Sequence, residues 1–385
     1  MNTLTAFYDL PKEWEVVRLL DITHIFDGTH QTPQYTHHGV AFFSVENIAN
    51  NKPNKFISQQ DYLIATSKNK PEYNDILLTR IGAIGISKVV SWTYPFSIYV
   101  TLAVIKQSKY FNSYYLHYFI QSSFFQKELK DNSLLQAIPC KINMDKLKKC
   151  KVILPPLNEQ IAIANILSGL DCYLCALDAL ILKKEGVKKA LSFELLSQRK
   201  RLKGFNQAWQ RVRLGDILSY EQPTKYLVAT TQYLQKGFTP ILTAGKTFTL
   251  GYTNDKHGIY TNIPVIIFDD FTTDSKMVNF PFKVKSSAIK ILSLRDNNQA
   301  DLKYIYEKLT LLKHQVTDHK RYWIDEFSNF EILLPPLNEQ NAIANILSAL
   351  DNEITSLKNK KRQFENIKKA LNHDLMSAKI RVLEK

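Results

Sequence analysis

Several signatures that define common protein classes are missing from this 385-residue chain. Its four cysteines are scattered, which argues against a disulfide framework and indicates a reducing, cytoplasmic environment. No run of eighteen consecutive apolar residues occurs, so we expect no membrane span. Residues 1–10 lack both the basic start and the apolar run of a secretory signal peptide, so we expect none.

Motifs for nucleotide and metal binding are missing as well. No G-x-G-x-x-G follows a strand-like segment, and Gly245-Lys246-Thr247 lacks the upstream glycine of a phosphate-binding loop because Pro240 stands there. Asp269, Asp270 and Asp274-Ser275-Lys276 resemble a nuclease carboxylate cluster, but their spacing is too tight for the usual metal-binding hairpin. We therefore expect no S-adenosylmethionine, nucleotide or metal site in this chain.

Two further short motifs have simpler explanations. Leu154-Pro155-Pro156-Leu157 has the spacing of the Asn/Asp-Pro-Pro-aromatic motif of amino-methyltransferases. Leucine, however, neither accepts a hydrogen bond from the target amine nor stacks on a flipped base. Cys172 and Cys175 form a C-x-x-C pair without two further ligands, so we expect a packing or exposed pair rather than a zinc or redox site.

What the chain does carry is an excess of positive charge. Its 50 Lys and Arg exceed its 36 Asp and Glu, a formal net charge of +14. A basic chain of this kind most often binds a polyanion, so nucleic acid is the first candidate partner. A basic protein without such a partner is the alternative that charge alone leaves open.

One stretch of the chain occurs twice. Residues 154–171 read LPPLNEQIAIANILSGLD and residues 334–351 read LPPLNEQNAIANILSALD, identical at sixteen of eighteen positions and 180 residues apart. Lys-Lys-Ala-Leu recurs at the same separation, at 188–191 and 368–371. Chance does not produce this pattern, so the chain is a tandem duplication.

Each copy predicts a long helix. The proline pair suits a helix start, because proline has a preset φ and no backbone donor to leave unpaired. Apolar residues then follow at alternating spacings of four and three, which is a coiled-coil seam. We expect about 45 residues per helix and antiparallel packing of the two helices; two unrelated solvent-facing helices are the alternative. The seam residues are Ile163, Leu167, Leu170, Leu174, Leu177, Ile343, Leu347, Leu350, Ile354 and Leu357.

A second repeat, W-x-x-V-R-L-x-D-I, marks where each module starts, at 14–22 and at 209–217. Between this start and the helix the two copies diverge, and both read as mixed α and β. The apolar pattern predicts strands at 76–78, 89–90, 98–105, 265–268 and 288–291 and amphipathic helices at 114–126 and 302–314.

The predicted fold class is therefore α+β with an internal pseudo-twofold repeat. Two globular mixed α/β domains are joined by two long antiparallel coiled-coil helices. The expected boundaries are 1–153 for the first domain, 154–203 for the first helix, 204–333 for the second domain and 334–385 for the second helix.

The two repeats together resemble the specificity subunit of type I restriction-modification systems, over essentially the whole chain. The resemblance implies that the divergent units are target recognition domains, each reading one half of a bipartite site in double-stranded DNA. It also implies an antiparallel coiled coil that spaces them and docks adenine-N6 methyltransferase subunits.

The same resemblance implies that this chain is not catalytic. Two modification (methyltransferase) subunits and two restriction subunits would complete the enzyme, and S-adenosylmethionine, ATP and Mg would bind only to those partners. Two alternatives stay open: a stand-alone DNA-binding scaffold or silent allele product, and a structural coiled-coil adaptor without salt-dependent DNA affinity.

In the first unit, the segment T-R-x-G-x-x-G and a preceding polar loop are candidate DNA-reading segments. Arg80 suits a guanine edge, and Gly82 and Gly85 would let the backbone approach a ligand. In the loop at 28–38, Gln31 and Gln34 suit adenine, and Tyr35 suits a phosphate. An ordinary hairpin and a mobile loop without contacts are the alternatives.

The second unit lacks that glycine pattern. Asp270 could accept a hydrogen bond from cytosine N4, and Lys246 suits a phosphate. Cations mixed with aromatic residues are typical of segments that clamp the DNA backbone, and here these are Lys320, Arg321 and Tyr322. Two lysines, Lys88 and Lys276, complete the predicted DNA contacts.

Overall fold

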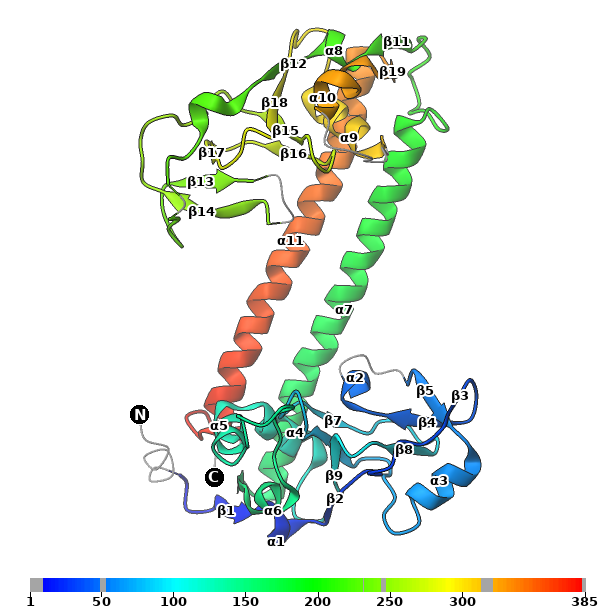
Figure 1. The fold of residues 1–385 in the computed structure, drawn as a ribbon, viewed down its shortest axis with the longest axis vertical. Coiled ribbons are helices and arrows are strands. Elements are labelled where there is room, and N and C mark those ends of the chain that lie inside the picture. Colours follow the sequence, from blue (N-terminus) through cyan, green and yellow to red (C-terminus); the bar gives the residue numbers. More distant parts are fainter. Residues whose placement is uncertain (1–9, 49–52, 231, 244–246, 313–320, 383–385) are drawn as a thin grey trace. The chain divides into compact units, whose positions relative to one another are not determined.

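The chain forms two compact units (Figure 1). The computed structural model describes residues 10–48, 53–230, 232–243, 247–312 and 321–382. Unit 1 comprises Met1–Asp178 and Asn359–Lys385, and unit 2 comprises Ala179–Lys358. Each unit therefore contains one globular domain, a part of one long helix and a part of the other.

The duplicated LPPLNEQ stretches begin the two long helices, α7 (Leu157–Leu196) and α11 (Leu337–Met376). Each has 40 residues, about 60 Å at 1.5 Å per residue, somewhat shorter than expected. Just beyond each helix a residue takes the left-handed conformation, Gln198 at φ 61° and Ala378 at φ 57°, which ends the helical pattern. These residues are 180 positions apart, so the stop is duplicated together with the helix.

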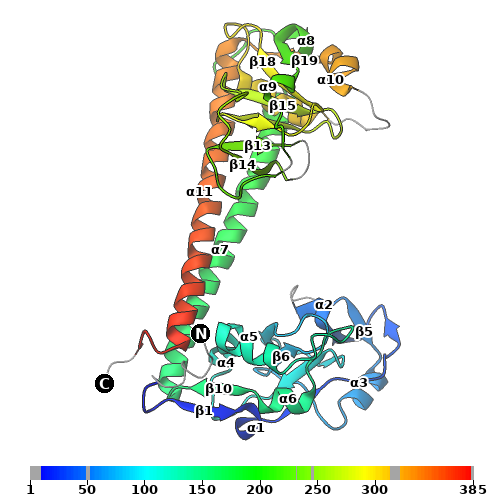
Figure 2. The ribbon, with the colours of Figure 1, turned by 60° about the vertical axis from the view of Figure 1, so that its left-hand side comes forward.

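Inside unit 1, the two helices pair in antiparallel fashion. Lys368 of α11 contacts Asp171 of α7, and Lys361 contacts Asp178 at 2.7 Å, so residue numbers rise along one helix as they fall along the other. The rings of Tyr173 and Phe364 lie 4.7 Å apart between these pairs. Figures 1 and 2 show the helices side by side.

Unit 2 pairs its parts of the helices in the same antiparallel sense. Lys188 contacts Asp351 at 2.7 Å, and Lys184 contacts Glu353 at 2.7 Å. Charged pairs thus flank an apolar seam in both units. All ten predicted seam residues are buried or half-buried: Ile163, Leu167, Leu170, Leu174, Leu177, Ile343, Leu347, Leu350, Ile354 and Leu357.

Among its described residues, the globular domain of unit 1 contains three sheets and short helices. Its start motif forms β1 (Glu15–Arg18), which pairs with β10 (Lys151–Leu154) directly before the proline pair of α7. The central sheet has the order β2 (Ile25–Asp27), β9 (Leu102–Ile105), β6 (Ile76–Thr79), β7 (Ser87–Val89). The other sheet has the order β3 (Tyr35–Thr36), β5 (Lys55–Ile57), β4 (Val40–Phe43), β8 (Phe96–Ile98). The helices are α1 (Leu19–Ile22), α2 (Val45–Ile48), α3 (Gln59–Ala65), α4 (Ser113–Gln121), α5 (Ser123–Asp131) and α6 (Met144–Lys149).

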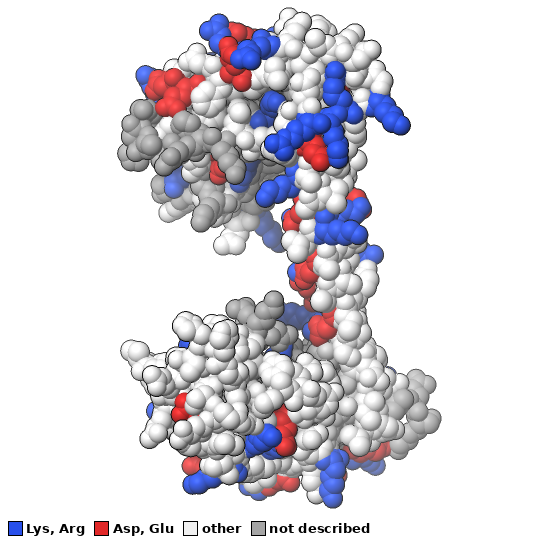
Figure 3. Space-filling view, turned by 90° about the vertical axis from the view of Figure 1, so that its right-hand side faces the viewer, with Lys and Arg blue, Asp and Glu red and all other residues white. Residues whose placement is uncertain are grey.

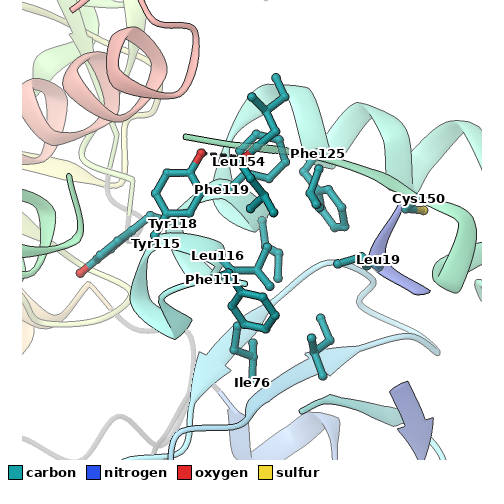
Figure 4. Close-up of a cluster of buried hydrophobic side chains, with 14 of the residues drawn as sticks. Leu19, Ile76, Phe111, Tyr115, Leu116, Tyr118, Phe119, Phe125, Cys150 and Leu154 are labelled. Carbon is teal, nitrogen blue, oxygen red and sulfur yellow. Dashed lines mark hydrogen bonds between the residues drawn. The ribbon is translucent and has the colours of Figure 1, made fainter. Parts of the chain in front are cut away.

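The central sheet of unit 1 is buried on both faces. Because side chains alternate along a strand, Ile76 and Leu78 of β6 join a core made with α4, α5 and the first turns of α7. Figure 4 shows part of this cluster, with Tyr115 and Phe119 of α4 and Phe125 of α5. Leu77, between them on β6, faces the second sheet in a separate apolar cluster.

Unit 2 repeats this plan with different residues. Strand β11 (Gln210–Arg213) pairs with β19 (Glu331–Leu334) before α11. The central sheet has the order β12 (Leu218–Glu221), β18 (Ile289–Leu294), β15 (Val265–Asp269), β16 (Ser275–Val278). The other has the order β14 (Thr249–Thr253), β13 (Thr239–Leu242), β17 (Lys283–Val284). The helices are α8 (Leu214–Ile217), η2 (Pro223–Tyr226), α9 (Leu302–Leu311), α10 (Tyr322–Asp325) and η3 (Phe327–Asn329).

Two expected elements are each divided in the structure. The helix expected at 114–126 is split into α4 and α5, because Ser122 adopts an extended backbone and its Oγ accepts the Phe125 N–H as a new helix cap. The strand expected at 98–105 is split between β8 and β9, which belong to different sheets. An apolar run does not reveal where the chain changes sheets.

Candidate nucleic-acid interface

Arg80, the predicted guanine reader of unit 1, is buried at the end of β6. Its Nη1 donates to Asp27 Oδ2 at 3.0 Å and to the Val100 carbonyl at 2.9 Å, and its Nε donates to the Ile142 carbonyl at 3.3 Å. Burial lowers the pKa of Arg80, and the Asp27 carboxylate opposes that shift. In this geometry the guanidinium holds the protein together rather than facing a base.

The partners of Arg80 show that several loops leave the central sheet at one edge. Asp27 ends β2 immediately before the polar loop at 28–38, and Arg80 itself begins the turn between β6 and β7. Ile142 closes the loop between α5 and α6, and its N–H donates to the Arg80 carbonyl at 2.9 Å. Arg80 therefore fixes three loops relative to one another, and this edge is the candidate DNA-reading edge of unit 1.

Asp270 occupies the corresponding position in unit 2, with the opposite charge. Leu78 pairs with Ser87 across β6 and β7, Phe268 pairs with Ser275 across β15 and β16, and two residues further along each strand lie Arg80 and Asp270. Asp270 is buried, accepts the Trp323 N–H at 3.0 Å and contacts Lys290 Nζ at 2.9 Å. A buried residue that is held in an ion pair thus supports this edge in both units, with Asp27 half-buried and Lys290 buried as the partners.

The glycines of the β6–β7 turn meet a conformational requirement. Gly82 has φ 83° and Gly85 has φ 94°, a region that residues with a side chain rarely adopt. Gly85 is buried, and a Cβ there would lie 2.7 Å from Gln126 Oε1 of α5. Gly82 has open space around a Cβ, so only Gly82 offers room for the close approach to a ligand predicted for both.

The polar loop that precedes β3 lies at the surface. Gln31 and Gln34 are exposed, as predicted for residues that would reach a base. Tyr35 belongs to β3 rather than to the loop, and Lys55 Nζ lies 5.2 Å from the centre of its ring. A cation beside an exposed ring suits a phosphate, although the contact with DNA itself stays a prediction.

Lys88 and Lys276 occupy equivalent positions on β7 and β16, opposite Leu77 and Ile267. Both are half-buried, and burial lowers the pKa of Lys88. Lys276 Nζ lies 4.4 Å from the centre of the Phe248 ring. Their duplication fits a common role, and their DNA contacts stay predictions.

The remaining predicted contacts of unit 2 are distributed differently. Arg321 is exposed where α10 begins, whereas Tyr322 is fully buried in the core, so its ring does not reach solvent in this structure. Lys246 and Lys320 lie outside the described residues. Of this predicted group, Arg321 is therefore the described side chain that DNA could reach directly.

The aspartates that resembled a nuclease cluster shape a turn. Asp269 Oδ1 accepts the Phe271 N–H at 2.8 Å, and Asp269 Oδ2 accepts the Thr272 hydroxyl at 2.7 Å. Within the described ranges, no group of three or more His, Cys, Asp or Glu side chains is placed to hold a metal ion. Cys172 and Cys175 are exposed on α7.

In each unit, one buried glutamate connects the globular domain to the two long helices. The sequence analysis did not predict this role. Glu159 accepts Arg381 Nε at 2.6 Å and Trp14 Nε1 at 3.1 Å in unit 1. Glu339 accepts Arg201 Nε at 3.0 Å and Trp209 Nε1 at 3.1 Å in unit 2. The signal was available: Glu and Arg recur at a separation of 180, and Trp belongs to the duplicated start motif.

On the face shown in Figure 3, Lys and Arg of unit 2 gather around its helical part, beside Asp and Glu. The globular part of unit 1 shows mostly uncharged residues on the same face. Within unit 2, Lys188 of α7 contacts Asp351 of α11 at 2.7 Å. Positive charge along the helices is thus partly neutralised by the protein itself.

By length and composition alone, α7 could cross a membrane. A helix that packs within a protein passes the same test, and Asp178 and Lys184 of α7 make ion pairs with α11 in their respective units. One helix of this kind is weak evidence for a membrane protein, so the expectation of no membrane span stays a prediction.

Residues 11–184 and 206–366 match a family model described as the type I restriction modification DNA specificity domain. The match covers well over half of the chain. The chain therefore belongs to the family of type I restriction-modification specificity subunits, which are DNA-recognition proteins.

Individual relatives agree with this assignment. The EcoR124I/EcoR124II specificity subunit of Escherichia coli is 49% identical over 150 residues, which are 38% of this chain and only 37% of that protein. The putative MjaX specificity subunit of Methanocaldococcus jannaschii is 26% identical over 419 residues, or 98% of this chain and 96% of that protein.

Solved structures show the same fold. The S subunit of a type I restriction-modification system from M. genitalium aligns with a TM-score of 0.66 at 16% identity, over 96% of this chain and 98% of that chain. A chain from a structure of type I complex assembly and conformational transition aligns with a TM-score of 0.54 at 13% identity, over 96% and 99%. The predicted fold class, two mixed α/β domains and a coiled coil of two long helices, is confirmed.

Proposed function

We propose that this chain reads a split site in double-stranded DNA, one half with each unit, and so directs the other subunits of a type I restriction-modification enzyme. The observation that carries the proposal is that the two units share the same central sheet, whereas the loops at the end of that sheet differ. Both central sheets have the same order, and both carry a buried, ion-paired residue at the same position, Arg80 in unit 1 and Asp270 in unit 2. The loops around those pairs differ in sequence, so we expect an asymmetric site.

The helices are suited to set the distance between the half-sites. Half-sites one turn of DNA apart are separated by roughly 34 Å, and each helix runs for about 60 Å. A stiff pair of helices fixes distance and phase better than a flexible linker. Deleting seven residues from both helices should therefore shorten the spacer in the recognised motif without changing the bases read; altered bases with an unchanged spacer would contradict this role.

Catalysis would belong to the partners. We infer two modification subunits and two restriction subunits, with S-adenosylmethionine, ATP and Mg bound to them, in the cytoplasm. Two features support this division of labour. The carboxylates that resembled a nuclease site hold a turn and an ion pair, and the relatives described above are specificity subunits by name.

The test is to sequence the methylated bases in a host that carries this chain together with its cognate modification subunit. We expect a new split motif with adenine-N6 methylation on both strands, lost when this chain is deleted. A complex with the modification subunit that produces no motif would contradict the proposal and favour a silent scaffold. Copurification of the two subunits is the control that the complex has formed.

A further inference from the structure

The loop between α5 and α6 exposes apolar side chains at the candidate DNA-reading edge of unit 1. Leu134 and Leu135 are each 49% exposed, and Ile138 is fully exposed. Gln136 between them is exposed as well. Apolar side chains gathered at a surface can mark a binding site, so this loop is a candidate contact surface.

The loop is held firmly at its base. The Gly82 N–H donates to the Cys140 carbonyl at 2.8 Å, and the Leu134 N–H donates to the Lys141 carbonyl at 2.7 Å. Ile81 and Lys141 form an antiparallel bridge. Residues 140–142 thus lie as an added strand beside the end of β6, and residues 134–139 project beyond it.

The charge around the loop suits a polyanion. Residues 80–90 and 132–144 contain no Asp or Glu, and their charged residues are Arg80, Lys88 and Lys141. Lys141, at the base of the loop, is exposed. Arg80 is paired with Asp27, and Asp131 and Asp145 flank the loop, so Lys141 is the exposed cation at the base of the apolar tip. Apolar side chains beside such a cation suit a DNA groove.

We propose that residues 134–141 form an apolar wedge that enters the DNA at the half-site read by unit 1. The inference rests on the proposed function and adds the element that makes the contact. Leu, Ile and Pro side chains that enter a groove can part neighbouring base pairs and kink the duplex. Here Leu135 and Ile138 press against the base stack, while Gln136 is placed to meet a base edge. Steps that unstack easily would then be favoured at this half-site.

The experiment uses the full chain in complex with its modification subunit and a duplex carrying the methylated motif. The fluorescent base 2-aminopurine is placed in each half-site in turn, and its emission rises when stacking is lost. The modification subunits extrude the target adenine in both half-sites, so the readout is the difference between the wild-type complex and the variants. Leu135→Ser and Ile138→Ser should lower the emission in one half-site only, that of unit 1, and weaken specific binding by about tenfold, with non-specific binding unchanged.

Leu63→Ser and Ile64→Ser on α3 are the matched controls, because these residues are 59% and 66% exposed in the same unit. They should leave both readouts unchanged. Wild-type emission and affinity in Leu135→Ser and Ile138→Ser would overturn the wedge. Loss of the modification subunit from these variants would overturn it too, because the loop would then be a protein contact. A wild-type complex that binds no specific site would instead refute the proposed function, before any variant is compared.

Discussion

Asp270 and Lys290 form an ion pair that is almost completely withdrawn from water, with side chains 6% and 4% exposed. The Trp323 N–H also donates to Asp270, so the carboxylate ties α10 to the central sheet of unit 2. Arg80 and Asp27 provide the corresponding support in unit 1. At the scale of single residues, buried charge therefore serves to position the loops of the candidate interface.

Asp270→Asn should lower the free energy of unfolding by about 3 kcal/mol, because it leaves the Lys290 ammonium buried without a counter-charge. Urea denaturation measures this loss. The control is Glu331→Gln, which breaks a pair with Arg211 whose side chains are 51% and 73% exposed and should cost at most about 1 kcal/mol. The double exchange of Asp270→Lys with Lys290→Asp should recover part of the loss. Equal losses of unfolding free energy in Asp270→Asn and Glu331→Gln would contradict this explanation.

His117 of α4 should make unit 1 sensitive to acid. Burial lowers its pKa to about 4; nearby Lys368 and Lys88 act in the same direction, and Asp171 acts against them. Between its ordinary pKa, about 6.5, and about 4, the unfolded chain takes up a proton that the folded chain does not. The contribution of neutral His117 to the free energy of unfolding is therefore fully present above about pH 6.5, and it is lost as the pH drops toward 4.

The comparison variant is His117→Gln, which retains hydrogen-bonding capacity but does not titrate. Urea denaturation of both proteins from pH 7.5 to 4.5 measures the difference between their free energies of unfolding. The variant should become more stable relative to the wild-type protein as the pH falls. A difference that does not vary with pH would show that His117 does not govern the acid response.

At the scale of elements, the ends of the long helices are conformationally costly. Gln198 and Ala378 carry side chains in the left-handed region, where glycine is normally favoured. Gln198→Gly and Ala378→Gly should each stabilise the protein by about 1 kcal/mol, measured as the free energy of unfolding in urea. Gly204→Ala, at φ 91° with open space around a Cβ, should have the opposite sign; stabilisation by all three would refute this explanation.

The long helices could be predicted from the sequence because their apolar residues recur at regular spacing. Helix and strand boundaries that depend on tertiary contacts could not be predicted. The two helices and their seam followed from the duplicated LPPLNEQ stretch and its spacing. The break at Ser122 depends on a cap hydrogen bond, and the division of 98–105 depends on which sheet each strand joins. Neither feature changes the apolar pattern of the chain.

The candidate site was only partly predictable for a related reason. Gln31 and Gln34 lie exposed in the polar loop, and their contact with adenine stays a prediction. Arg80 and Asp270 have the chemistry of base readers, but partners distant in sequence, Asp27 and Lys290, withdraw them from the surface. The exposed loop around Ile138 gave no sequence signal, because apolar residues in a short run normally predict burial.

At the scale of the whole molecule, duplication gives two units that share a frame and differ at their edges. Each unit joins its start motif to its own helix through paired strands, β1 with β10 and β11 with β19. Each also closes on the end of the other helix through a buried glutamate and an arginine. The recognising edge of one unit should therefore be exchangeable without rebuilding the other.

The most direct test of this account is the methylated motif of a chimera in which residues 14–153 are replaced by the corresponding domain of another specificity subunit. The chimera is expressed with the modification subunit, and copurification shows that the complex forms. We predict that one half of the motif changes, while the other half and the spacer length stay the same. A motif in which both halves change would contradict the claim that each unit reads its own half-site.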